Sequence, residues 1–383
     1  STQGVSSAAS DVYKRQLRRR RSNSSSRRKR FVHAESEKQM LSAPVNLMEL
    51  DRTAMQGYFA ALGEKTFRAD QVLKWVYQRG VTRFEEMTNL SKSLRKSLTR
   101  TAIVEVPAVG EQKQSSDGTI KWQFVLSDGN QVETVFIPES DRGTLCVSSQ
   151  AGCALNCSFC ATARQGFSRN LSTSEIIGQV WMAKRILQQE DYGERPLTNI
   201  VLMGMGEPLL NYQAVVRALR LMLDDFSFGL SRRRVTLSTA GVVPGIDQLR
   251  IDCPVSLAVS LHAPDDELRT QLVPLNRKYP IVSLLAACSR YIYGDPRRRV
   301  TFEYTMLDGI NDGLSQAISL ARLLQGMPAK VNLIPYNRVE GISFATSPQS
   351  RIDAFRDVLL SAGIMCITHK TRGADIDLSL IHI

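Results

Sequence analysis

Three closely spaced cysteines are the strongest chemical signal in the chain. Cys153, Cys157 and Cys160 form a C-x3-C-x2-C motif on a segment that follows an apolar run. Structural zinc normally takes four nitrogen or sulfur ligands, and no fourth Cys or His lies close on the C-terminal side. An iron–sulfur cluster held by three thiolates leaves one iron open to another ligand. The spacing therefore predicts a [4Fe–4S] cluster, with a zinc knuckle or incidental cysteines as the alternatives.

The other cysteines point to a reducing compartment. Seven cysteines is an odd number, which argues against a complete disulfide framework. Cys253, Cys288 and Cys366 stand among apolar neighbours, where a free Cys usually packs as a small hydrophobe. Cys146 alone reads as a buried strand cysteine. No apolar segment of a signal peptide follows the basic N-terminal residues, so we expect a cytoplasmic protein.

A second segment suited to a ligand is Gly204-Met-Gly-Glu-Pro208. It follows the apolar run 199–203, and the carboxyl ends of parallel strands are where barrel sites are built. Glycines let the backbone approach a ligand, and the Glu207 carboxylate can accept hydrogen bonds from an ammonium group. Taken alone, the pentapeptide could equally be a plain turn.

Alternating strands and helices must position these two segments. We expect six strands, at residues 199–203, 234–238, 255–260, 300–306, 330–334 and 365–369. Helical patterns begin between them, near Thr173, Tyr212, Gly245, Asp265, Ile281, Gly313 and Ser347. This α/β alternation predicts a parallel sheet, and six units fit a partial (β/α)6 barrel.

The remaining residues divide into tails, a helical module and a hairpin. We expect a disordered basic tail, partly non-native, at 1–40, a helical RNA-binding-like domain at 41–104, a β-hairpin extension at 105–140, the barrel core at 141–377 and a non-native tail at 378–383. The net charge of +12 is concentrated in the first 30 residues, which carry ten Lys/Arg against one Asp. No run of 18 apolar residues exists, so a membrane-spanning helix is excluded.

The motifs resemble two nested families. The cysteine spacing, with Phe159 just before the last Cys, resembles the radical S-adenosylmethionine (SAM) superfamily, and Gly204–Pro208 resembles its glycine-rich GGEP-type segment. Over residues 47–377 the chain resembles the RlmN family of RNA methyltransferases. The matching stretches are 63–71, 115–122, 132–135, 145–149, 152–157, 203–208, 234–239, 260–262, 332–335 and 370–373.

The resemblance implies methyl transfer to C2 of an adenine in 23S rRNA, at the peptidyl-transferase centre, and in tRNA, next to the anticodon. In this family one SAM methylates a cysteine, and a second SAM yields a 5′-deoxyadenosyl radical that activates the S-methyl group. By resemblance Cys153, Cys157 and Cys160 bind the [4Fe–4S] cluster. Glu133 is the general base, and Cys146 resolves the protein–RNA crosslink by forming a disulfide bond.

The resemblance also implies the SAM contacts and the partners. The residues that map to SAM contacts are Gly206, Glu207, Ser238, Ser260, Leu261, His262 and Asn337. Alone, His262 would more often be a core histidine. The expected partners are 23S rRNA, tRNA and an electron donor such as flavodoxin, with no membrane association and a monomeric chain.

The chain departs from the family at its C-terminal end. The methyl-carrying cysteine should fall at position 380, where this sequence has Leu. We therefore expect a truncated record with foreign residues at both ends, and an enzyme that is inactive as written. Two other functions stay open: methylation of adenine C8, which confers antibiotic resistance, and RNA binding around a structural cluster.

Overall fold

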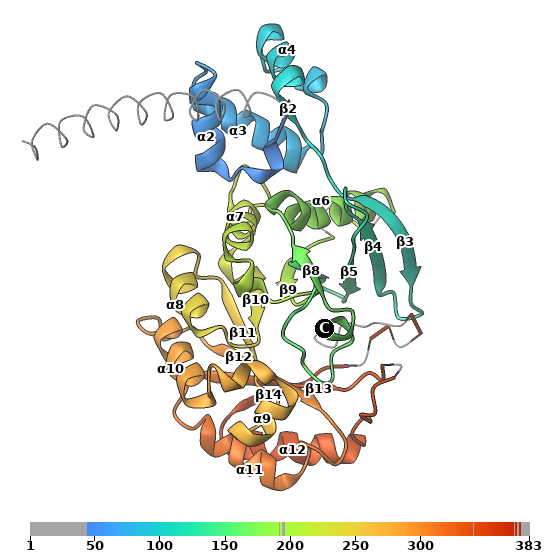
Figure 1. Ribbon diagram of the computed structural model, residues 1–383, viewed down its shortest axis with the longest axis vertical. Helices are drawn as coiled ribbons and strands as arrows, with labels where there is room; N and C mark the ends of the chain where they lie inside the picture. Colours follow the sequence, from blue (N-terminus) through green and yellow to red (C-terminus); the bar gives the residue numbers. More distant parts are fainter. Residues whose placement is uncertain are drawn as a thin grey trace, which may run out of the picture.

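The computed structural model describes residues 44–190, 192–193, 196–339, 341–370, 372–373 and 375–376. The expected tails at 1–40 and 378–383, including position 380, lie outside these residues. One ten-stranded sheet forms the body, in the order β14-β13-β12-β11-β10-β9-β6-β5-β4-β3. Figure 1 shows a separate cap of short helices above this body. No helix of the described part is long and apolar enough to cross a membrane.

Seven strands of this sheet run parallel and form the barrel. They are β6 (Gly143–Cys146), β9 (Asn199–Leu202), β10 (Val235–Thr239), β11 (Ser256–Ser260), β12 (Val300–Met306), β13 (Ala329–Pro335) and β14 (Met365–Thr368). Six of them were predicted. The seventh, β6, was not predicted as a separate strand.

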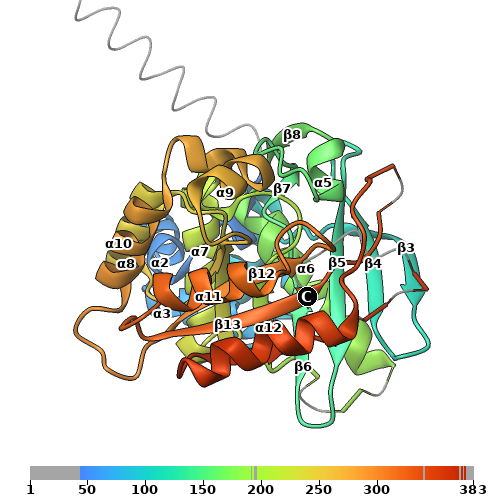
Figure 2. The ribbon, with the colours of Figure 1, turned by 90° about the horizontal axis from the view of Figure 1, so that it is seen from below.

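Amphipathic helices cover the outer surface of the parallel strands (Figure 2). They are α6 (Thr173–Gln189), α7 (Tyr212–Leu223), α8 (Val243–Asp252), α9 (Asp266–Leu272), α10 (Ile281–Ile292), α11 (Leu314–Leu323) and α12 (Gln349–Ser361). Their starts lie within two residues of the predicted positions. The α/β fold class is thereby confirmed, because each helix returns the chain for another parallel strand.

The antiparallel strands extend the sheet beyond β6. The predicted hairpin is β4 (Ile120–Val125) and β5 (Gln131–Pro138), and a third strand, β3 (Ala108–Gln114), continues the edge. Asp128 closes the hairpin turn by accepting a hydrogen bond from the Asn130 backbone N–H at 3.0 Å. Behind the strands, Gln179 of α6 is fully buried and binds Thr134 and both backbone groups of Ser148. This side chain joins the extension to the barrel.

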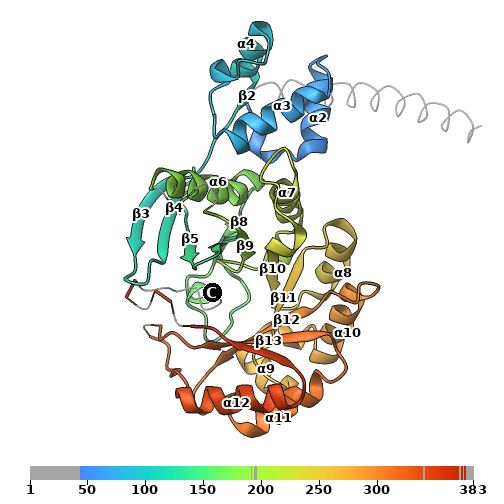
Figure 3. The same ribbon diagram turned by 180° about the vertical axis from the view of Figure 1, so that it is seen from behind.

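The helical cap contains α2 (Arg52–Ala61), α3 (Phe67–Leu73), a π-helical turn η2 (Lys74–Gln78) and α4 (Lys92–Thr101). Two short parallel strands, β1 (Val45–Asn46) and β2 (Ala102–Ile103), bring its two ends together. Figure 3 shows the cap lying against α6 and α7. The Glu49 carboxylate, from the turn η1 (Leu47–Glu49), accepts hydrogen bonds from the backbone N–H groups of Thr173 and Ser174 at the start of α6. An anion at a helix N-terminus is stabilising, so the cap and the barrel share a polar contact.

A buried arginine ties the carboxyl ends of the central strands. Arg269 of α9 is fully buried and donates hydrogen bonds to the carbonyl oxygens of Ala240 and Ser260 at 2.7 and 2.9 Å. It also donates to Leu261 O and to Asn276 Oδ1. Burial lowers the pKa of the guanidinium to about 10, so it stays charged at neutral pH. The turns that follow β10 and β11 are therefore held by one side chain.

We predict that Arg269→Met lowers the free energy of unfolding by about 3–5 kcal/mol, because four buried acceptors lose their charged donor. Chemical denaturation followed by circular dichroism measures this change. The control is Arg322→Met, which removes an exposed arginine from α11. An Arg269→Met variant as stable as this control would show that the four hydrogen bonds contribute no net stability.

Candidate functional site

A cavity opens at the carboxyl ends of β9, β10 and β11. Its lining brings together eight of the residues that sequence analysis singled out, from four separate segments. They are Cys153, Cys157, Cys160, Gly206, Glu207, Ser238, Ser260 and His262. We call this space the upper cavity. Its composition combines thiols with small polar groups, which suits a metal centre beside a polar organic ligand.

The three cysteines lie on a loop between β7 (Gln150–Gly152) and the short helix α5 (Ala161–Arg164). The Ser158 backbone N–H donates to Leu272 O at 3.0 Å, which anchors the loop to α9. Burial, together with the neighbouring thiols, raises the pKa of Cys153 to about 11 and raises that of Cys157 further. Cysteine thiols become thiolates when a cationic centre binds them, as iron does.

The three cysteines line one cavity. Among the described residues, no three His, Cys, Asp or Glu side chains are arranged to hold a single metal ion. A four-iron cluster has separate iron corners, each of which takes its own thiolate. Three thiols around one space are a donor set that such a cluster can use.

Gly206 and Glu207 adopt a tight turn against the cysteine loop. Gly206 has a φ of +94°, and a Cβ there would lie 2.4 Å from the Gln150 Cβ. Gln150 in turn accepts a hydrogen bond from the Glu207 backbone N–H at 2.8 Å. Only glycine allows both the backbone conformation and this approach. The sequence analysis did not predict a role for Gln150, because this residue belongs to no recognisable motif.

The Glu207 side chain is buried and already has partners. Its oxygens accept hydrogen bonds from the backbone N–H groups of Leu209 at 3.0 Å and Ala240 at 2.7 Å. Burial raises the pKa of this carboxyl to about 7. Glu207 thus joins the turns after β9 and β10, and each oxygen keeps a further lone pair for a ligand.

His262 connects the end of β11 to the cysteine loop. It is fully buried, has a positive φ of 61°, and its Nδ1 accepts a hydrogen bond from the Thr305 backbone N–H at 3.0 Å. Its ring lies edge-on to Phe159 with centroids 4.7 Å apart. An unusual backbone conformation that the surroundings impose is common at ligand sites.

Two predicted SAM contacts lie outside the lining of the upper cavity. The Leu261 side chain is buried in the hydrophobic core, and its backbone N–H and C=O already bind Glu303 and Arg269. Asn337 is partly buried in the loop after β13. Neither residue is brought to the cavity, so their assignment rests on the resemblance alone.

Cys146 and Glu133 face the interior of the barrel. Cys146 is fully buried and pairs with Val135 on one side and Val201 on the other. Side chains alternate along a strand, so Glu133, two residues from Val135, lies on the same face of the sheet. Burial raises the pKa of the Cys146 thiol to about 12. Glu133 forms an ion pair with Lys121 at 3.3 Å. The two proposed catalytic side chains therefore lie on neighbouring strands and share a face.

A second cavity of about 380 Å³ lies inside the barrel, between the amino-terminal halves of the strands. We call it the lower cavity. Met203 lines both cavities. The deepest charged residue of the lower cavity is Glu303 of β12, which is 1% exposed and whose pKa burial raises to about 7. Lys330 of β13, which also lines this cavity, acts against that rise.

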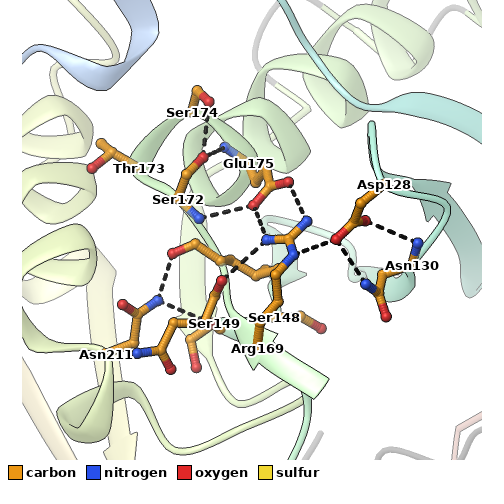
Figure 4. Close-up of polar contacts among 12 residues, drawn as sticks. Asp128, Asn130, Ser148, Ser149, Arg169, Ser172, Thr173, Ser174, Glu175 and Asn211 are labelled. Atoms are coloured by element: carbon orange, nitrogen blue, oxygen red, sulfur yellow. Dashed lines mark hydrogen bonds and ion pairs between the residues drawn. The ribbon is translucent and has the colours of Figure 1, made fainter. Parts of the chain in front are cut away.

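Arg169 supports the cysteine loop from the outside (Figure 4). It comes from β8 (Phe167–Asn170) and binds both Glu175 oxygens at 2.7 Å. It also binds Asp128 in the hairpin turn at 2.5 Å. Nearby, Asn211 donates to the carbonyl oxygens of Ser149 and Leu171. These polar residues fix β7 and β8, two short strands that the sequence analysis missed.

None of the seven cysteines is in a disulfide bond; Cys253, Cys288 and Cys366 are buried, as predicted. A resting disulfide is therefore not supported. Any disulfide of Cys146 would form only during the reaction.

We predict that Glu303 makes stability fall as pH rises. Its folded pKa lies above the ordinary value of 4.5, so the folded state binds the proton more tightly than the unfolded chain does. This stabilisation is complete below about pH 4.5 and is lost as pH rises to about 7, on the order of 3 kcal/mol in all. Denaturation curves of wild type and Glu303→Gln between pH 5 and 8 measure it. The variant should gain relative stability with rising pH, and parallel profiles would contradict the assignment.

Comparison with known proteins identifies the family. Residues 45–104 match the model of the ribosomal RNA large subunit methyltransferase N-terminal domain (RlmN), and residues 147–321 match the radical SAM superfamily. A radical SAM methyltransferase from Sphaerobacter thermophilus is 43% identical, with a TM-score of 0.82 over 88% of this chain and 99% of that one.

More distant structures resemble only part of the chain. SuiB of Streptococcus suis bound to S-adenosylmethionine is 14% identical over 59% of this chain and 50% of that one, with a TM-score of 0.43. A domain of the pyruvate-formate lyase-activating enzyme from Bacteroides vulgatus is 17% identical over 45% and 99%, with a TM-score of 0.35. The cap, the cysteine loop and the extended match to the Sphaerobacter enzyme agree: the chain belongs to the RlmN-like family of radical SAM methyltransferases.

Proposed function

We propose that the protein methylates C2 of an adenine in 23S rRNA, at the peptidyl-transferase centre, and in tRNA, next to the anticodon. The observation that supports this most is the arrangement of Cys146 and Glu133 on the interior face of the sheet. Cys146 lies beside β9, whose carboxyl end opens into the upper cavity, and the Glu133 backbone N–H donates to the Met205 sulfur in the turn after β9. A methyltransferase that used SAM by direct displacement would need no thiol at that position.

The chemistry of the residues that line the upper cavity suits the two cofactors that membership of the superfamily implies. Cys153, Cys157 and Cys160 would hold a [4Fe–4S] cluster, and Gly206, Glu207, Ser238, Ser260 and His262 would contact SAM. Leu261 and Asn337 complete the SAM contacts by resemblance. When bound, the reduced cluster supplies the electron that cleaves SAM into methionine and a 5′-deoxyadenosyl radical.

The interior residues would complete the transfer. Glu133 would accept the proton from C2 of the methylated adenine, and its ion pair with Lys121 holds the carboxylate in place at the barrel wall. The Cys146 thiol would then attack the sulfur that links protein and RNA. An S–S bond would form as the S–CH2 bond breaks, the thiol proton would leave, and the released carbon would take up a proton to become the methyl group. Burial raises the pKa of this thiol to about 12 and so keeps it protonated at neutral pH.

This sequence departs from the family pattern at the residue that carries the methyl group. The family places a cysteine at position 380, where Leu stands here, outside the described residues. We further propose a cytoplasmic monomer that receives electrons from a flavodoxin-like donor.

Nucleoside mass spectrometry tests the proposed product. We expect no methylated adenine when the reconstituted chain acts on an unmodified 23S rRNA fragment with SAM and a reductant. Leu380→Cys should produce 2-methyladenosine, because it restores the expected methyl carrier. Adding Cys153→Ser to that variant should abolish both the product and the iron–sulfur absorbance. Formation of 8-methyladenosine would instead support the C8 activity, and activity of the unaltered chain would show that position 380 is not required.

Cys146 has a separate test in the Leu380→Cys background. Cys146→Ala should accumulate RNA that stays covalently attached to the protein, since the thiol that resolves the link is missing. A denaturing gel with labelled RNA shows the attached species. Cys288→Ala, which removes a buried cysteine of α10, is the matched control and should release free product. Free 2-methyladenosine from Cys146→Ala at the control's rate would rule out the assigned role.

A further inference from the structure

The lower cavity has a polar lining that packing does not explain. Interior positions of a small parallel barrel are usually filled by branched apolar side chains. Here the strands instead present Asn199, Thr236, Thr301, Glu303, Lys330 and Asn332 to a space of about 380 Å³. A cavity of this size and polarity is suited to a polar aromatic ligand.

Glu303 carries the one carboxylate oxygen in this cavity that the structure leaves buried without a partner, within the described residues. Its Oε1 accepts a hydrogen bond from Asn332 Nδ2 at 3.0 Å, whereas Oε2 has no hydrogen-bond partner there. Leaving a buried acceptor unpaired is costly, since it has given up water without compensation. Because Asn332 occupies Oε1 and Glu303 lines the lower cavity, Oε2 is the oxygen of this carboxyl that is left for a ligand.

The lower cavity adjoins the proposed reaction centre. Glu303 pairs in register with Ser260, which lines the upper cavity. Met203 lines both spaces. A base held by Glu303 would therefore lie directly below the residues proposed to contact SAM.

We propose that the lower cavity receives the substrate base and that Glu303 Oε2 accepts a hydrogen bond from the 6-amino group of a purine. This inference deepens the proposed function and rests on it. Glu303 would then be the residue that selects adenine over 6-oxo purines.

The selectivity follows from the base edges. Adenine carries an amino donor on C6, whereas guanine and hypoxanthine carry an oxygen acceptor there. When Glu303 is ionised, a 6-oxygen of the base that faces Oε2 meets a second acceptor, so both oxygens stay buried and unpaired. Anchoring the 6-amino group leaves C2 free, because C2 is separated from C6 by a ring nitrogen.

Binding of modified RNA tests the proposal without requiring turnover. A hairpin fragment of 23S rRNA carries adenosine, inosine or purine riboside at the reacting position, and fluorescence anisotropy measures its affinity for the reconstituted protein. At about pH 8.5, where Glu303 with its pKa of about 7 is ionised, we expect wild type to prefer adenosine to inosine by about tenfold or more. Glu303→Gln should reverse the order, because its amide keeps the contact with Asn332 and offers an N–H donor to the 6-oxygen.

Glu111→Gln is the matched control. Glu111 is exposed on β3, is paired with Lys113 and lines neither cavity, so the same replacement is made away from the proposed base site. It should keep the adenosine preference. Equal affinities for adenosine and inosine in wild type, or an unchanged preference in Glu303→Gln, would overturn the proposal.

A further measurement separates this inference from the proposed function. Cleavage of SAM to 5′-deoxyadenosine without RNA requires the upper cavity alone. If Glu303→Gln still cleaves SAM and its base preference is reversed, both the proposed function and the role of Glu303 are supported. If wild type cleaves SAM but does not distinguish the bases, only the role of Glu303 fails. If wild type does not cleave SAM, the proposed function fails.

Discussion

The four hydrogen bonds of Arg269 are the constraint on which the arrangement of the upper cavity depends. The turns after β10 and β11 have to leave the sheet at the point where they surround a ligand, so their carbonyl oxygens cannot pair with further strands. One charged group satisfies three of these oxygens at once. Its charge also acts on the Cys157 thiol, for which it lowers the pKa against the larger effect of burial. The same residue thus supports the polypeptide and the anionic centre that the cysteines would form.

The barrel interior is divided into two levels that match the two halves of the proposed reaction. The upper level, at the strand ends, contains thiols, glycines and small hydroxyl groups. The lower level contains amides, hydroxyl groups and Glu303. Met203 lies at the boundary, and Cys146 is on the strand beside it. Cofactor chemistry and recognition of a base would then occupy neighbouring spaces of one barrel, with no movement of the strands required.

Features that long or repeated sequence patterns encode could be predicted from the sequence. Apolar runs located six parallel strands, and the cysteine and glycine motifs located most of the upper cavity. The sequence did not predict the contributions of Arg269, Gln179 and Gln150, because each is a single polar residue whose partners are distant in sequence. Glu303 was hidden for the same reason: inside the strand 300–306 it interrupts an apolar pattern, and only the register with Ser260 shows its proximity to the site. Leu261 shows that a motif position need not present its side chain to the cavity, because this side chain is buried in the core.

The π-helical turn of the cap links two parts that could otherwise be regarded as independent. Near η2, the carbonyl oxygens of Val76, Tyr77 and Gly80 accept hydrogen bonds from Trp181, Lys184 and Arg185 of α6. Backbone carbonyl groups of the cap therefore find their hydrogen-bond donors among side chains of the barrel. A chimaera that joins this cap to another radical SAM barrel would also have to include Trp181, Lys184 and Arg185 of α6. The boundary at which the two sequences can be joined without loss of folding therefore lies inside the barrel and not at the linker.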